Sequence, residues 1–178
     1  MDIAAIIIIM LIGAVIIFVF YVIGLYNKIL DARNRVYMKF EQIDIELNKI
    51  LNLIPGLIKN VEKNVKHEDR ILGSVNEVRK SILNVKDINE KIGVMSFLFE
   101  SLDKVFGLQV CYFELKKEKD FVNYLNKINK MKDKINYASS FYNEEVSNYN
   151  DKLKEFPLNI VSKVFKFREM KTCNIDNK

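Results

Sequence analysis

The chain has 178 residues, enough for one domain of ordinary size and one additional segment. It contains only two prolines and six glycines, and this scarcity of turn-forming residues favours a few long elements over many short strands. Its two cysteines, Cys111 and Cys173, form neither a disulfide framework nor a metal-binding spacing. The formal net charge of +5 fits either a solvated surface or a surface that approaches anionic lipid or acidic partners.

An uninterrupted apolar stretch runs from Ile3 to Leu25, and Tyr21 is its only ionisable residue. A helix over this stretch extends about 34 Å, compared with about 30 Å of hydrocarbon in a bilayer. Isoleucine and valine favour strands in water, but a strand of this length would far exceed the usual range. The sequence therefore predicts a transmembrane anchor over residues 1–25. A cleaved signal peptide is disfavoured, because the N-terminus lacks positive charge and no small-residue cleavage site follows.

Basic residues lie only on the C-terminal side of the apolar stretch, beginning with Lys28 and Arg33. The positive-inside rule then places the N-terminus outside the cell and the remainder of the chain in the cytoplasm. A domain displayed on the cell surface is the alternative, because only Met1 and Asp2 precede the stretch.

Apolar residues after the anchor recur with helical spacing in three long blocks. In the first block, residues 26–65, two rows spaced by seven form a continuous stripe, as in helices that pack at a shallow angle. The rows are Val36, Ile43, Ile50 and Leu57, and Phe40, Leu47, Ile54 and Val61. Pro55 lies inside this stripe, yet the phase of the stripe is the same on both sides of it. The pattern favours a kinked but continuous helix, with a true turn as the alternative.

The second block, residues 68–113, carries a row of apolar residues at strict sevens from Ile71 to Phe113. The accompanying row changes register near Asn89, and we expect any interruption over residues 87–93. The second block is therefore predicted to form either one long helix or two helices separated by a single break.

The third block, residues 118–155, again shows a row spaced by seven: Phe121, Ile128, Ile135, Tyr142, Tyr149 and Phe156. Pro157 is expected to end this helix. Short polar connections between the blocks force neighbouring helices to be antiparallel. The sequence thus predicts an all-α fold, in which residues 26–156 form an elongated, coiled-coil-like antiparallel bundle. The bundle has three long helices, or four if the chain breaks at Pro55 or near Asn89.

Three segments follow one another along most of the chain: YNKILDARNR at 26–35, LNLIPGLIKNVEKNVKHEDRIL at 51–72 and FYNEEVSNYNDKLKEFPLNIVSKVFKF at 141–167. In this order they resemble the LemA family of bacterial membrane-associated proteins. The resemblance implies an N-terminal transmembrane helix, an antiparallel helical bundle and no established enzymatic activity. The chain departs from the family at Phe40, where tryptophan is frequent, and at Gly56, where asparagine is common.

The only histidine of the chain, His67, is followed by Glu68. A zinc protease would need a second histidine in the pattern HExxH, and the run here is HEDRI. We interpret the pair as a helix junction, with Glu68 well placed near a helix N-terminus. The adjacent acids Glu144 and Glu145 have no partner nucleophile or base. We predict no catalytic, cofactor or metal site, and no nucleic-acid binding, because basic and acidic residues are interleaved.

One polar pair repeats at heptad spacing: Tyr142-Asn143 and Tyr149-Asn150. The tyrosines fall on the core row, where their rings pack while the hydroxyls reach the edge of the bundle. The asparagines are expected to hydrogen-bond across to another helix and so to fix its register.

Residues 157–178 form an amphipathic basic tail in which apolar and basic residues alternate. The tail either caps the end of the bundle or lies against lipid or a partner as an interfacial helix. The number of helices distinguishes the two arrangements. Three helices would leave the tail far from the bilayer, whereas an additional true turn at Pro55 would return it.

These observations favour a membrane-anchored, non-enzymatic scaffold or interaction protein. It would contact the bilayer through residues 3–25 and a protein partner near the membrane. The alternative is a ligand-binding or enzymatic bundle with a hidden site. That alternative would need ionisable residues on the core rows, which are almost wholly apolar or tyrosine.

Overall fold

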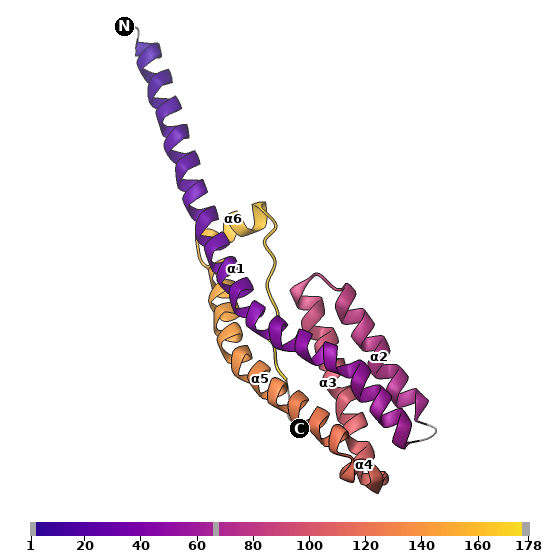
Figure 1. Cartoon of the computed structure of the whole chain (residues 1–178). Helices are drawn as coiled ribbons and strands as arrows, with labels where there is room; N and C mark the ends of the chain where they lie inside the picture. The colour runs from indigo at the N-terminus through magenta and orange to yellow at the C-terminus, as the bar shows by residue number, and fades with distance from the viewer. Residues whose placement is uncertain (1–2, 66–67, 176–178) are drawn as a thin grey trace. The chain divides into compact units, whose positions relative to one another are not determined.

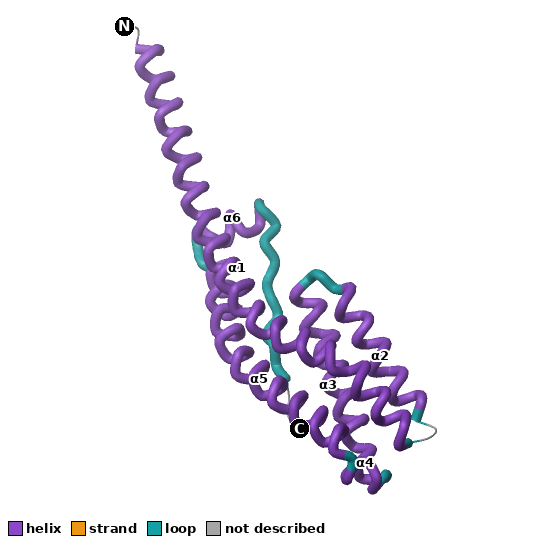
Figure 2. Tube along the Cα trace, viewed as in Figure 1, coloured by secondary structure: helices purple, strands orange, loops and turns teal. Residues whose placement is uncertain are grey.

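The structure is a computed structural model of the chain, and it describes residues 3–65 and 68–175. Within these ranges the chain forms six α-helices and no strand (Figures 1 and 2). The helices are α1 (Ile3–Asn64), α2 (Asp69–Asn84), α3 (Ile88–Cys111), α4 (Phe113–Lys117), α5 (Lys119–Lys154) and α6 (Leu158–Val164). The predicted all-α fold is confirmed.

The chain folds as two compact units, and α1 and α5 contribute to both. The first unit joins the chain up to Tyr37 with Glu144–Met170. It contains the beginning of α1, the end of α5 and α6. The second unit joins Met38–Asn143 with the segment that begins at Lys171, and it contains α2, α3 and α4.

Helix α1 confirms that the first block is a continuous helix. It is continuous through Pro55, and every residue of the two predicted rows is at most 6% exposed. Pro55 lacks an amide hydrogen, so the carbonyl of Leu51 loses its usual intrahelical partner. The Arg79 side chain of α2 donates from Nε to this carbonyl at 2.7 Å. The gap in the hydrogen bonding of α1 thereby becomes an attachment point for α2.

The second block is broken once. The prediction of one long helix over this block is therefore wrong, and the alternative with four long helices in the bundle is confirmed. Helices α2 and α3 are joined through residues 85–87 and pack against each other. The break begins two residues before the expected range and overlaps it at Asp87, because Asp87 caps α3: its side chain accepts a hydrogen bond from the backbone N–H of Glu90 at 3.1 Å.

The row of strict sevens in the second block is therefore partly accidental. Helix α2 buries Leu72, Val75 and Ile82, whereas Ile71 and Val78 are only half-buried. At the other end of the row, Phe113 is 63% exposed. A spacing of seven has no structural meaning across a turn, because the turn resets the face that each helix presents.

Helix α5 follows the third predicted block. Its core row is buried from Phe121 to Tyr149, with no member more than 1% exposed. The prediction for Phe156 is wrong: α5 ends at Lys154, and the Phe156 side chain is 76% exposed. The peptide bond between Phe156 and Pro157 is cis, and α6 begins directly after it.

In each unit, α1 and α5 run in opposite directions (Figure 1). In the second unit, Glu46 of α1 lies 3.5 Å from the ammonium group of Lys134 on α5. In the first unit, Arg35 pairs with Glu145 at 3.2 Å, and Tyr26 meets Phe165, which follows α6. The tail thus returns to the part of α1 where the apolar segment ends. We expected this return only with a true turn at Pro55, but α1 is continuous there and the additional reversal lies between α2 and α3.

Candidate functional site

No three histidine, cysteine or acidic side chains converge as metal ligands within residues 3–65 and 68–175. His67 lies outside the described residues. Glu68 precedes α2 and accepts a hydrogen bond from the Tyr112 hydroxyl at 2.9 Å. This bond raises the pKa of Tyr112 and ties the beginning of α2 to the end of α3. The contact of Glu68 is thus structural.

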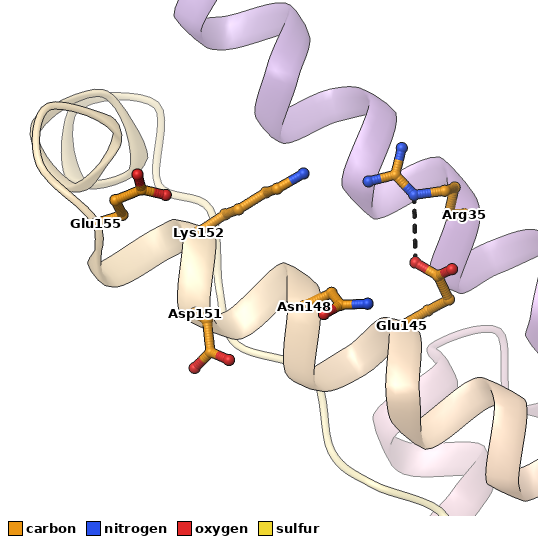
Figure 3. A pocket seen from close by; sticks show the side chains of 6 residues that line it. All are labelled: Arg35, Glu145, Asn148, Asp151, Lys152 and Glu155. Carbon is orange, nitrogen blue, oxygen red and sulfur yellow. Dashed lines mark hydrogen bonds and ion pairs between the residues drawn. The ribbon is translucent and has the colours of Figure 1, made fainter.

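A surface depression of about 520 Å³ lies between α1 and α5 in the first unit (Figure 3). It is lined by Arg35, Glu145, Asn148, Asp151, Lys152 and Glu155. The Arg35 guanidinium turns toward Glu145, while Asp151 points away from both (Figure 3). Arg35 and Glu145 are 40% and 20% exposed, and a partly solvated ion pair of this kind contributes at most about 1 kcal/mol. Among the side chains that line the depression, Arg35 and Glu145 form an ion pair, and none carries a hydroxyl, thiol or imidazole group.

The densest convergence of polar side chains lies where the tail runs along α5. In the second unit, the Asn143 amide forms two hydrogen bonds with the main chain of Cys173. Nδ2 donates to the Cys173 carbonyl at 3.0 Å, and Oδ1 accepts from the Cys173 N–H at 2.7 Å. The hydroxyl of Tyr142 donates to the Lys171 carbonyl at 2.9 Å.

The first unit repeats this arrangement with the second Tyr–Asn pair. The Asn150 amide donates to the Met170 carbonyl and accepts from the Met170 N–H, both at 2.9 Å. The Tyr149 hydroxyl donates to the Arg168 carbonyl at 3.0 Å. We call each Tyr–Asn pair with its main-chain contacts a rung. The partner of both asparagines is therefore the extended tail, and not another helix as we expected.

Helix and strand dimensions explain why the rungs repeat. Seven residues of helix advance about 10.5 Å, and three residues of extended chain advance about 10 Å. The tail residues that the two asparagines hold, Met170 and Cys173, are separated by this interval of three. All these bonds go to main-chain atoms, so α5 binds the tail as the edge of a sheet would. The signal for this site, two Tyr–Asn pairs seven apart, is visible in the sequence.

A sequence model of the LemA family matches residues 39–178. The chain belongs to the LemA family. A comparison with curated proteins gives no match. The matched residues include both rungs and the tail of this LemA-family protein, whereas the apolar segment of α1 precedes them.

In this LemA-family protein, Cys173 is buried, at 1% exposure, beside residues of the tail that are exposed or half-buried. Its thiol accepts a hydrogen bond from the Ser139 hydroxyl at 3.2 Å. Burial raises the pKa of the Cys173 thiol, and the bond from Ser139 opposes this shift in part. Cys111, in contrast, is exposed. The pairing of Ser139 with Cys173 could not be predicted from the sequence, because an extended tail has no periodicity that would place it.

The end of α6 is fixed by a turn in which Lys166 adopts φ 57°. The Phe167 N–H donates to the Ser162 carbonyl at 2.9 Å, and the Lys166 N–H donates to the Lys163 carbonyl at 3.3 Å. These are the two bonds of a Schellman motif, with lysine where glycine is usual. The turn brings Phe167, together with Phe165, to the ring of Tyr26, with centroid distances of 5.5 and 4.9 Å.

Proposed function

We propose that this LemA-family protein is a membrane-anchored, non-enzymatic interaction protein whose first helix spans a bilayer. One observation carries the proposal: the apolar segment of α1 contains an 18-residue window with a mean hydropathy of 3.3, and none of this window is buried in the protein. Covering a single large apolar side chain contributes about 1.5–3 kcal/mol. A contiguous apolar surface of this extent needs a cover, and a bilayer supplies one.

The orientation follows from charge. Lys28, Arg33, Arg35 and Lys39 come after the apolar segment, and the positive-inside rule supports an outside N-terminus and a cytoplasmic helical body.

The helical body supports a role in binding rather than in chemistry. The buried rows of α1 consist of aliphatic and aromatic side chains, and two tyrosines complete the row on α5. The polar side chains that do converge, on the rungs, hold a peptide main chain. A partner near the membrane would therefore meet a helical surface.

Membrane fractionation tests the anchor. We expect the full chain to stay in the membrane pellet after alkaline carbonate extraction. In a matched variant, Ile12→Lys and Ile16→Lys place two charges at the centre of the span, each at a cost of about 2.5–3.5 kcal/mol. That variant should leave the pellet. Recovery of the unaltered full chain in the soluble fraction would refute the proposal.

Protease treatment of intact spheroplasts tests the orientation, because a cytoplasmic body is protected until the membrane is opened. Digestion of the body in intact spheroplasts would instead favour the externally displayed alternative.

Chemical crosslinking in membranes, followed by purification of the full chain and of the Ile12→Lys/Ile16→Lys variant, tests the interaction. A protein partner should be recovered with the anchored full chain and not with the variant. Recovery of the same proteins with both chains would contradict the proposed interaction.

A further inference from the structure

Helix α6 lies beside α1 at the level where the exposed apolar segment ends. Leu25 is the first buried residue of α1 in the described part of the chain, and every large apolar residue before it from Ile3 to Phe20 is exposed. Tyr26, the next residue, contacts both Phe165 and Phe167. Figure 1 shows α6 crosswise to α1 at this place. If α1 spans a bilayer, α6 is therefore level with the boundary of the hydrocarbon.

One face of α6 is already used within the first unit. Leu158, Val161 and Ser162 are buried, and the Ser162 hydroxyl donates to the Leu153 carbonyl of α5 at 3.1 Å. This inner face caps the end of α5. It accounts for the buried side chains of α6 and leaves the other side of the helix uncovered.

The uncovered side is apolar, contrary to expectation for a helix in water. We define the outer face of α6 as Ile160 and Val164 together with the flanking residues Phe156 and Phe165, which are 55%, 68%, 76% and 49% exposed; one side of the Phe165 ring also contacts Tyr26. Residues 156–168 include the exposed Lys163, Lys166 and Arg168 and no acidic residue, and Glu155 and Glu169 flank this range. Aromatic and aliphatic side chains bordered by lysine and arginine are typical of helices that lie in a membrane interface.

We propose that the outer face of α6 lies in the headgroup layer of the bilayer that α1 spans, where Lys163, Lys166 and Arg168 bind anionic lipid headgroups. This inference rests on the proposed membrane anchor. The apolar side chains insert at the boundary of the acyl chains, and each basic side chain near an anionic surface adds an attraction of about 1 kcal/mol. The inner face keeps its capping role, so α6 joins the end of α5 to the membrane surface.

The absence of tryptophan from the chain makes a direct test possible. Phe165→Trp introduces a single fluorophore on the outer face. The full-length variant is reconstituted into vesicles of phosphatidylcholine, with and without phosphatidylglycerol, and with bromine on the acyl chains of a fraction of the lipids. We expect blue-shifted emission from the tryptophan and strong quenching by brominated lipid, both greater when phosphatidylglycerol is present.

Tyr37→Trp is the matched control, because Tyr37 is 43% exposed and belongs to the same unit. It lies about 16 Å farther along α1 than Tyr26, at 1.5 Å per residue, so brominated acyl chains should leave its emission unchanged. In the Phe165→Trp chain, Lys163→Gln and Lys166→Gln each remove one positive charge and should each lower the ratio of bound to free α6 by about fivefold in the anionic vesicles.

Vesicle flotation separates this inference from the proposed function. If the full chain fails to float with lipid, the anchor itself is wrong. If the chain floats but the tryptophan at position 165 is unquenched and emits as in water, the anchor stands and the interfacial position of α6 is wrong. Equal quenching with and without phosphatidylglycerol would overturn the assignment of anionic headgroups.

Discussion

Replacing Asn143 with alanine tests whether the rungs hold the tail. The substitution removes both hydrogen bonds between the Asn143 amide and the main chain of Cys173, at 3.0 and 2.7 Å, and a longer bond of 3.3 Å to Asn174. Each of the two shorter bonds contributes about 0.5–1.5 kcal/mol. Their loss should therefore favour the released tail by about 1–3 kcal/mol, which raises the equilibrium constant for release roughly 5- to 150-fold.

The two cysteines supply the assay. Cys173 is 1% exposed, so a thiol reagent reaches it only when the tail opens, whereas Cys111 is exposed at all times. The labelling rates of both thiols are measured by mass spectrometry in the same sample. In Asn143→Ala, Cys173 should be labelled roughly 5- to 150-fold faster, and Cys111 should be labelled at the same rate as in the unaltered chain.

Asn148→Ala is the matched control, because Asn148 is an exposed asparagine on the same helix and lies off the rungs. Its labelling kinetics should equal those of the unaltered chain. An unchanged rate at Cys173 in Asn143→Ala would refute the reasoning. It would show that the side-chain packing of Cys173, and not the Asn143 amide, holds this part of the tail.

Three further predictions concern the second unit. Arg79→Ala removes a charge-assisted bond and should lower the free energy of unfolding in urea by about 1.5–3 kcal/mol. The loss should be smaller in a Pro55→Ala chain, where residue 55 gains an N–H for the same carbonyl; equal losses would contradict this coupling. Gly56→Ala favours helix by about 1 kcal/mol, but its Cβ would collide with the Tyr124 hydroxyl, so we expect a lower melting temperature that Tyr124→Phe partly restores. Because burial raises the pKa of Cys173 above 9.0, its contribution to tail binding is complete below pH 9.0 and is lost as pH rises through the raised pKa. Labelling of Cys173 relative to Cys111 should then increase above pH 9.0, and a constant ratio would contradict the assignment.

The sequence predicted α1 well because a long helix with one buried stripe repeats the same signal many times. The unchanged phase on both sides of Pro55 indicated a continuous helix, and the helix is continuous. The contact that compensates for the proline could not be predicted in the same way. It depends on Arg79 of another helix, and periodicity within one helix carries no information about which side chain of a neighbour reaches it.

The break at residues 85–87 shows the opposite case. Val85 continued the row of apolar residues spaced by seven and so concealed the turn. Asp87 nevertheless signalled a helix start, because aspartate is strongly favoured at the N-cap position. A capping residue is a local signal, and here it was more reliable than the longer pattern. The turn also determines where the tail goes: one additional reversal brings Phe165 to Tyr26, instead of leaving the tail at the other end of α1.

The rungs explain why the tail gave so weak a signal in the sequence. A segment that is held through its side chains must present a regular pattern of them, whereas a segment held through its main chain is free of that requirement. Asn143 and Asn150 bind carbonyl and N–H groups that every residue except proline offers. The specificity then resides in the spacing of α5, where seven helical residues match three extended ones. Within residues 168–173 the side chain of Cys173 alone is buried, so this position is the one at which the identity of the tail residue matters for binding.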